Sequence, residues 1–283
     1  HSIRMPNRAS AVAVVAAAAD AVAAAGAVTD RKIRRSQRMP RRIILNLLPF
    51  AAFSLFANST PQSTALPAKA AQLPQAEAPT PARFIRRNEG VILTRLKKPM
   101  AAAETPYPPK AVRLAVFKEE RKAELWLPDK NGKWRYVKEY AFSAMSGGAG
   151  PKLYYGDLQI PEGIYGIDSM GLSREYHLAL HVDYPNAFDK AMLELEGRDP
   201  GYVSTGINVH GGNISYGCVV IGNRNIEEFF LLAYLAGKEN TQVYIFPHDA
   251  DRAQPVFKPC EQCPVWYTEL QRTLAQVLPE FKR

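Results

Sequence analysis

A cysteine and a histidine stand eight positions apart in this chain, on either side of a short polar loop. His210 ends an apolar run that has the pattern of a short strand, and Cys218 opens a second apolar run at 219–221. If the loop folds back, the imidazole can take the thiol proton and make Cys218 a nucleophile. The spacing alone favours the alternative, a buried structural thiol and a histidine bonded to the backbone. Three glycines allow sharp turns and close approach of a bound molecule here: Gly211, Gly212 and Gly217.

Three cysteines are present, and the other two form a Cys-Glu-Gln-Cys pair near the end of the chain. In an oxidising compartment Cys260 and Cys263 are expected to form a disulfide. Half of a metal site is the alternative, but the sequence has no second Cys or His cluster at ligand spacing. We therefore interpret the pair as structural, which leaves Cys218 as a single reactive thiol.

The net charge of +9 is concentrated at the front of the chain. Residues 1–106 carry 16 Lys and Arg against 5 Asp and Glu, whereas residues 107–283 carry 20 against 22. The later part is near neutral and has no basic stripe with aromatic residues, so the composition argues against nucleic-acid binding.

A secretory signal is the best interpretation of residues 39–57. Arg38, Met39, Arg41 and Arg42 precede a mainly apolar run at 43–57, and small polar residues follow. Residues 1–38 are then an upstream extension. An uncleaved membrane anchor is the alternative, although the run is short for a span of about 20 residues. Either interpretation places the folded part outside the cytoplasm, in the periplasm.

Residues 58–109 are rich in Pro, Ala, Gln, Ser and Thr, which is typical of a linker. Within it, 84–98 mixes apolar and basic residues and could form a short helix or strand that packs on the domain. We expect one catalytic domain at 110–250, followed by a C-terminal extension at 251–283.

Alternating apolar residues predict strands, and turn residues separate them. Strands are expected at 112–117, 123–127, 134–142, 177–182 and 241–246, and the first three should form an antiparallel sheet. Another strand should follow a turn within 157–167, and 146–152 is expected to be a flexible loop. Helical spacing is found at 186–195, from an N-cap at Asn225 to Gly237, and at 269–277. The predicted class is mainly β with a few helices (α+β).

Several blocks in this order resemble the YkuD-type L,D-transpeptidase catalytic domain, and within it the YafK-like subgroup. They are Gly150-Pro151-Lys152, Gly156-Asp157, Pro161-Glu162-Gly163-Ile164-Tyr165, Tyr176-His177-Leu178, Tyr184-Pro185-Asn186-Ala187-Phe188-Asp189, Val209-His210-Gly211 and Ser215-Tyr216-Gly217-Cys218. The resemblance covers roughly 112–249. It implies a β-sandwich or barrel with a catalytic loop.

The resemblance also implies roles for individual residues. Cys218 is the expected nucleophile, ionised beside an imidazolium at His210, and the carbonyl of Gly211 orients the ring. The amides of Gly217 and Cys218 form the expected oxyanion hole. The expected substrate contacts are Lys152, Tyr154, Tyr176, His177, Ser215 and Tyr216, and for Lys152 a solvated loop charge is the alternative.

Two departures from the broader family pattern are visible. Tyr216 stands where that family usually has a second histidine, and the loop back to His210 is shorter, as in the YafK-like subgroup. The Arg or Asn that usually follows the cysteine is missing, and Asn223 comes too late to be equated with it.

The implied function is peptidoglycan processing through an acyl-enzyme on Cys218, without a metal or organic cofactor. The enzyme would be an L,D-transpeptidase, or an amidase that releases a wall-linked lipoprotein. The expected partners are stem peptides and that lipoprotein, with no nucleic acid and at most an N-terminal membrane anchor. The alternatives are a non-catalytic wall-binding or assembly protein and a general cysteine peptidase.

Overall fold

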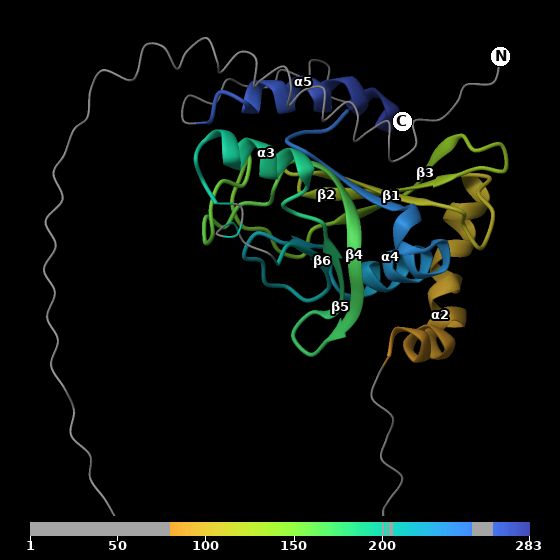
Figure 1. Ribbon diagram of the computed structural model, residues 1–283. Helices are drawn as coiled ribbons and strands as arrows, with labels where there is room; N and C mark the ends of the chain where they lie inside the picture. Colours follow the sequence, from red (N-terminus) through yellow and green to blue (C-terminus); the bar gives the residue numbers. More distant parts are fainter. Residues whose placement is uncertain (1–79, 200, 202, 204–205, 251–262) are drawn as a thin grey trace, which may run out of the picture. The chain divides into compact units, whose positions relative to one another are not determined.

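The computed structural model describes residues 80–199, 201, 203, 206–250 and 263–283. The expected signal, the upstream extension and residues 58–79 of the expected linker therefore lie outside the described residues. Eight strands form one sheet in the order β3-β2-β1-β8-β4-β5-β6-β7 (Figure 1). Their bounds are β1 Val112–Phe117, β2 Lys122–Pro128, β3 Trp134–Ala141, β4 Gly163–Ser173, β5 His177–Val182, β6 Asn208–His210, β7 Val219–Val220 and β8 Thr241–Phe246. The mainly β class with a few helices is confirmed.

The pairing of the first three strands is antiparallel, as predicted. Two parallel pairs were not predicted: β1 with β8, and β6 with β7. The long strand β4 joins the two parts of the sheet, because its start pairs with β8 and its later part pairs with β5. An irregularity in the β4–β5 register between Ile167 and Ser169 marks this change of partner.

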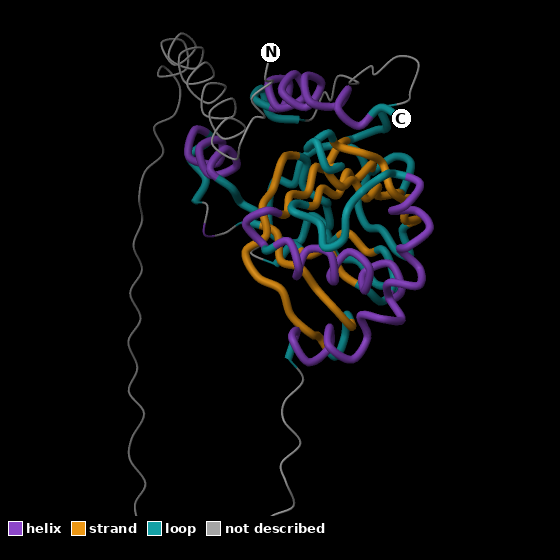
Figure 2. Tube along the Cα trace, turned by 90° about the vertical axis from the view of Figure 1, so that its right-hand side faces the viewer, coloured by secondary structure: helices purple, strands orange, loops and turns teal. Residues whose placement is uncertain are grey.

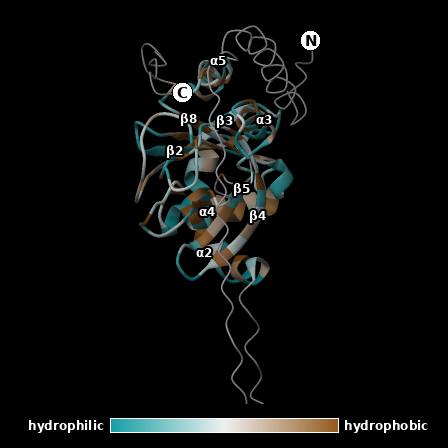
Figure 3. Ribbon diagram, turned by 60° about the vertical axis from the view of Figure 1, so that its left-hand side comes forward, coloured by the Kyte–Doolittle hydropathy of each residue, from teal (hydrophilic) through white to brown (hydrophobic). Residues whose placement is uncertain are grey.

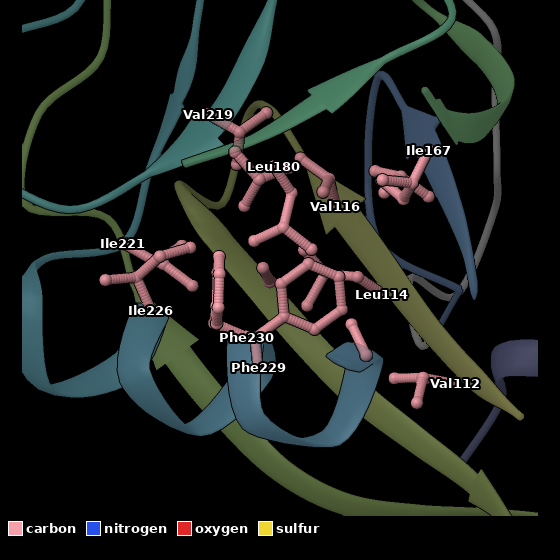
Figure 4. Close-up of a cluster of buried hydrophobic side chains, with 14 of the residues drawn as sticks. Val112, Leu114, Val116, Ile167, Leu180, Val219, Ile221, Ile226, Phe229 and Phe230 are labelled. Atoms are coloured by element: carbon pink, nitrogen blue, oxygen red, sulfur yellow. The ribbon is translucent and has the colours of Figure 1, made fainter. Parts of the chain in front are cut away.

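Both faces of β1 are buried, so its apolar residues serve two cores. Leu114 and Val116 face helix α4, Asn223–Ala236, whose Phe229 and Phe230 are fully buried (Figure 4). Ala115 and Phe117 belong to a second cluster, which includes residues of helix α5, Tyr267–Val277. Figure 2 shows helices around the central strands.

The folded unit begins earlier than the predicted start at 110. Helix α2, Pro81–Ala102, is capped by Thr80 and buries Ile85, Ile92, Leu96 and Met100. Arg95 of α2 bonds Glu228 of α4 at 2.9 Å and Glu227 at 2.7 Å, which fixes the two helices together. The C-terminal part of the expected linker is therefore an element of the domain, because its apolar stripe is wide enough to be buried.

The C-terminal extension is likewise packed against the sheet through α5 and the short helix η3, Leu278–Phe281. Helix α3, Ala187–Leu195, follows a capping box made by Asn186 and Asp189. Helix α4 starts three residues earlier than predicted, after Gly222 rather than Asn225. The remaining short helix, η2, spans Lys238–Asn240. None of the described helices combines the length and apolar character that a membrane crossing needs.

Candidate active site

His210 and Cys218 lie on neighbouring segments of the sheet. Strands β6 and β7 are parallel, with Val209 opposite Val219 and His210 opposite Val220. Cys218 directly precedes β7, so by continuing the register it lies opposite Asn208. Asn208 is two residues before His210 on β6. From strand spacing and rise, the Cα atoms of His210 and Cys218 are about 8 Å apart, on the same face. The short loop does fold back.

The Cys218 thiol is free and half-buried, and it donates a hydrogen bond to the carbonyl of Gly206 at 3.5 Å. Burial raises the pKa of this thiol above its ordinary value. Backbone and side-chain hydrogen bonds from Asn208 and the positive charge of Lys152 act in the opposite direction but are smaller. Cys263 is disulfide-bonded, whereas Cys260 lies outside the described residues.

The His210 ring is buried, and its Nδ1 lies 2.6 Å from the carbonyl oxygen of Gly211. A carbonyl only accepts, so Nδ1 carries the proton and Nε2 is left as a base. Burial lowers the pKa of the imidazole, against a smaller opposing effect of the bond to Gly211. Burial thus disfavours the charged form of both groups, which acts against the thiolate–imidazolium pair expected from the sequence.

Tyr176 contacts the histidine and lies close to the cysteine. Its ring centroid is 4.2 Å from that of His210, with the planes tilted by 37°. Burial raises the pKa of Tyr176, and the nearby Cys218 and Tyr216 add to this shift. The tyrosine therefore covers the imidazole and faces the same space as the sulfur.

The loop after His210 is held from two sides. The side-chain oxygen of Asn223 accepts the amide hydrogen of Gly212 at 2.7 Å. A Cβ atom on Gly211 would lie 2.6 Å from the same oxygen and 2.8 Å from the carbonyl of Tyr176. Only glycine fits there, so the carbonyl that orients His210 is positioned by close packing. Asn223 thus supports the site from the start of α4.

Gly217 differs from the expectation. Its N–H, expected in an oxyanion hole, donates to the hydroxyl of Ser146 at 2.7 Å. Ser215, expected to touch substrate, bonds Ser146 at 3.0 Å and the carbonyl of Cys218 at 2.8 Å. With φ at +106°, Gly217 also packs on the carbonyl of Gln159. These contacts stabilise the turn before the cysteine, and the amide of Cys218 remains as the candidate oxyanion donor.

Lys152 is neither a solvated loop charge nor an open ligand contact. Its side chain is buried, and its Nζ bonds Asp157 at 2.5 Å and the carbonyl of Tyr154 at 3.1 Å. Asp157 in turn accepts the backbone N–H groups of Leu153 and Gln159. Lys152 therefore organises the loop and acts on Cys218 through its charge. The segment 146–152, expected to be flexible, is tied down by these bonds and by those of Ser146.

The other expected substrate contacts lie in two places. His177 is turned away toward the helices: its Nε2 lies 3.0 Å from Glu227 of α4, and its ring meets Phe84 of α2 edge to face. Tyr154 and Tyr216 are 61% and 71% exposed, and Tyr216 is near Tyr176. Both remain available to a bound molecule.

Two residues that position the site were missed from the sequence, Ser146 and Asn208. Asn208 had a usable signal, since it stands two residues before His210 on the same strand face. Ser146 acts across the fold and had none. Asn223 was noted in the sequence but set aside, because it follows the cysteine too late to match the family pattern. Within the described ranges, no group of three His, Cys, Asp or Glu side chains could hold a metal ion.

Comparison with known proteins bears on the resemblance noted from the sequence. The chain is 33% identical over 142 residues to "Putative L,D-transpeptidase YafK" of Escherichia coli K12, and equally to that of Escherichia coli O157:H7. The resemblance to YafK is confirmed. The match covers 48% of this chain and 54% of each relative, so the chain spans about half the length of these curated relatives. No family model matches the chain.

Two solved structures are similar at low identity. The helical cell shape determining protein Pgp2 of Campylobacter jejuni has 21% identity and a TM-score of 0.40, with 56% of each chain covered. Bd1075 of Bdellovibrio bacteriovorus has 21% identity and a TM-score of 0.36, with 62% of this chain and 58% of that one covered. Neither likeness bears on function.

Proposed function

We propose that this chain is a periplasmic cysteine enzyme that processes peptidoglycan stem peptides through an acyl-enzyme on Cys218. The observation that carries the proposal is the parallel pairing of β6 and β7, which brings the free, half-buried Cys218 onto the segment next to His210, whose Nδ1 is fixed by Gly211. The similarity to YafK supports the substrate class. A stem peptide and a wall-linked lipoprotein are the proposed partners.

The proposed reaction has two steps. His210 Nε2 takes the Cys218 proton as the sulfur attacks an amide carbonyl, and the amide of Cys218 stabilises the oxyanion. The C–N bond then breaks, the leaving amine receives that proton from His210, and a thioester remains. An amine acceptor resolves the thioester by transfer, and water resolves it by hydrolysis.

A carbapenem tests the nucleophile, because it is a reactive acyl donor. Intact-mass measurement should show one adduct on the full chain and none on Cys218→Ala. His210→Ala should slow adduct formation by at least about a hundredfold, since general-base assistance contributes about 10²–10⁴-fold. A wild-type chain that forms no adduct would favour the non-catalytic binding protein.

Purified muropeptides, with and without a covalently attached lipoprotein peptide, identify the reaction. Mass spectrometry of the products should show exchange of the terminal residue for a transpeptidase, or free lipoprotein peptide for the amidase. Cleavage of ordinary all-L peptides at a comparable rate would instead indicate a general cysteine peptidase.

A further inference from the structure

Helix α2 presents a basic face that the described fold leaves exposed. Arg86, Arg87, Lys97 and Lys98 are all exposed, and none of them makes an ion pair with another described residue. Eleven residues make about three helical turns, so Lys97 lies nearly above Arg86 and Lys98 nearly above Arg87. The two cation pairs are therefore on one face, about 16 Å apart.

The opposite face of α2 packs against the rest of the domain. Ile92 and Leu96 are buried, and Arg95 is bound to Glu227 and Glu228 of α4. Figure 1 shows α2 beside α4, and Figure 3 shows both hydrophilic and hydrophobic residues along α2. This packing fixes the rotation of the helix, so the four cations point outward permanently.

We propose that this face of α2, defined by Arg86, Arg87, Lys97 and Lys98, binds a membrane surface rich in anionic phospholipid. Its charge is complementary to such a surface, and each Lys or Arg near an anionic leaflet contributes about 1 kcal/mol, or about fivefold in affinity. Between the cation pairs stands Val91, which is 64% exposed and can contact the headgroup boundary. The inference does not depend on the proposed acyl-transfer chemistry.

A membrane fits this face better than a nucleic acid does. Binding of single strands relies on aromatic rings that stack on bases, and the one aromatic residue of α2, Phe84, packs on His177 and Phe230 instead. The order of the chain points the same way. Twenty-three residues separate the apolar run that ends at residue 57 from the helix start at Pro81. If that run sits in a bilayer, the covalent chain of 23 residues keeps α2 within reach of the same surface.

Vesicle sedimentation of the full chain tests the proposal. Phosphatidylcholine vesicles with and without one quarter phosphatidylglycerol are compared, so that insertion of the apolar run contributes equally to both. The wild type should bind the anionic vesicles at least about tenfold more tightly, and 0.5 M salt should remove the difference. The variant R86Q/R87Q/K97Q/K98Q should lose the preference and keep the wild-type circular dichroism spectrum.

A matched control neutralises four exposed cations elsewhere, K130Q/K133Q/R174Q/K190Q, with the same change of net charge. It should keep the anionic preference, and R86K/R87K should keep it as well, because attraction to lipid needs charge rather than geometry. The proposal is overturned if the quadruple α2 variant binds anionic vesicles like the wild type. It is also overturned if the four cations are needed only for binding isolated cell wall or DNA.

Discussion

The hydroxyl of Ser146 accepts a hydrogen bond at 2.7 Å from the backbone N–H of Gly217, across 71 positions of sequence. This bond connects the segment after β3 to the turn that directly precedes Cys218. The same hydroxyl contacts Ser215, which holds the carbonyl of Cys218. The orientation of the proposed nucleophile therefore depends on a side chain from a distant part of the chain.

Replacing Ser146 with Ala should loosen this turn. The N–H of Gly217 loses its closer acceptor and keeps only the hydroxyl of Ser215 at 3.4 Å, and a poorly satisfied buried donor costs about 1–3 kcal/mol. We expect urea unfolding to show a loss in that range and the rate of carbapenem acylation to fall by about tenfold. Ser169→Ala, at an exposed position of β4, should change neither. Acylation at the wild-type rate in Ser146→Ala would show that the turn holds its shape without the hydroxyl.

The Cys218 thiol should lose its proton only at a pH above the ordinary range for cysteine. Burial raises the pKa of Cys218 and lowers that of His210, so it disfavours the charged form of both groups. The rate of iodoacetamide alkylation should therefore rise with a single midpoint above about 8.5, the ordinary cysteine value. His210→Ala should leave that midpoint nearly unchanged, because a neutral ring contributes little to it. A midpoint below pH 7 that rises in His210→Ala would instead indicate a preformed ion pair.

A buried ion pair holds the segment before β4. Lys118 donates to Glu162 at 3.0 Å and to two backbone carbonyls, and Tyr267 of α5 donates to the other carboxylate oxygen at 2.5 Å. Glu162→Gln leaves a buried ammonium without its counter-charge, for which about 3–5 kcal/mol of lost stability is expected. Tyr267→Phe removes one charge-assisted bond, and about 1–3 kcal/mol should be lost.

Denaturant unfolding of both variants checks these values. Tyr234→Phe, which is half-exposed, is the control and should stay within about 0.5 kcal/mol of the wild type. If Tyr267→Phe also leaves the stability unchanged, the hydrogen bond from α5 does not contribute to holding this segment.

Asp189 should make stability depend on pH. Burial raises the pKa of its carboxyl to about 7, against the opposing bond from the amide of Asn186. Because the folded-state pKa lies above the ordinary value near 4, the carboxylate is the costly form, and stability falls as pH rises from about 4 to about 7. Asp189→Asn keeps an acceptor at the cap and cannot ionise.

The stability of Asp189→Asn relative to the wild type should therefore improve between pH 4 and pH 8, by up to a few kcal/mol. Urea unfolding at the two pH values measures the difference, and the exposed Glu194→Gln serves as the control. A difference that does not change with pH would show that Asp189 is already ionised when buried.

Short-range patterns in the sequence were enough for most of the elements. The alternation at 112–117, 177–182 and 241–246 matches the observed strands, and Asn186 caps α3 as its residue type predicts. The roles of His210 and Gly211 also depend on neighbouring residues, so the contact between the ring and the next carbonyl could be expected. Secondary-structure preferences and contacts between sequence neighbours depend only on the local order of residues, so the sequence is enough to predict them.

Tertiary structure alone decided the contacts across the sheet. Parallel pairing of β6 and β7 places Asn208 beside Cys218. The contact between two segments distant in sequence lets the N–H of Gly217 donate a hydrogen bond to the hydroxyl of Ser146. Burial depends on the whole fold: it raises the pKa of the Cys218 thiol, lowers that of the His210 imidazole, and leaves Lys152 paired with Asp157. The same effect made α2 part of the domain, because its apolar stripe found α4 to pack against. Desolvation and long-range packing are properties of the assembled fold, and for that reason the sequence could not supply them.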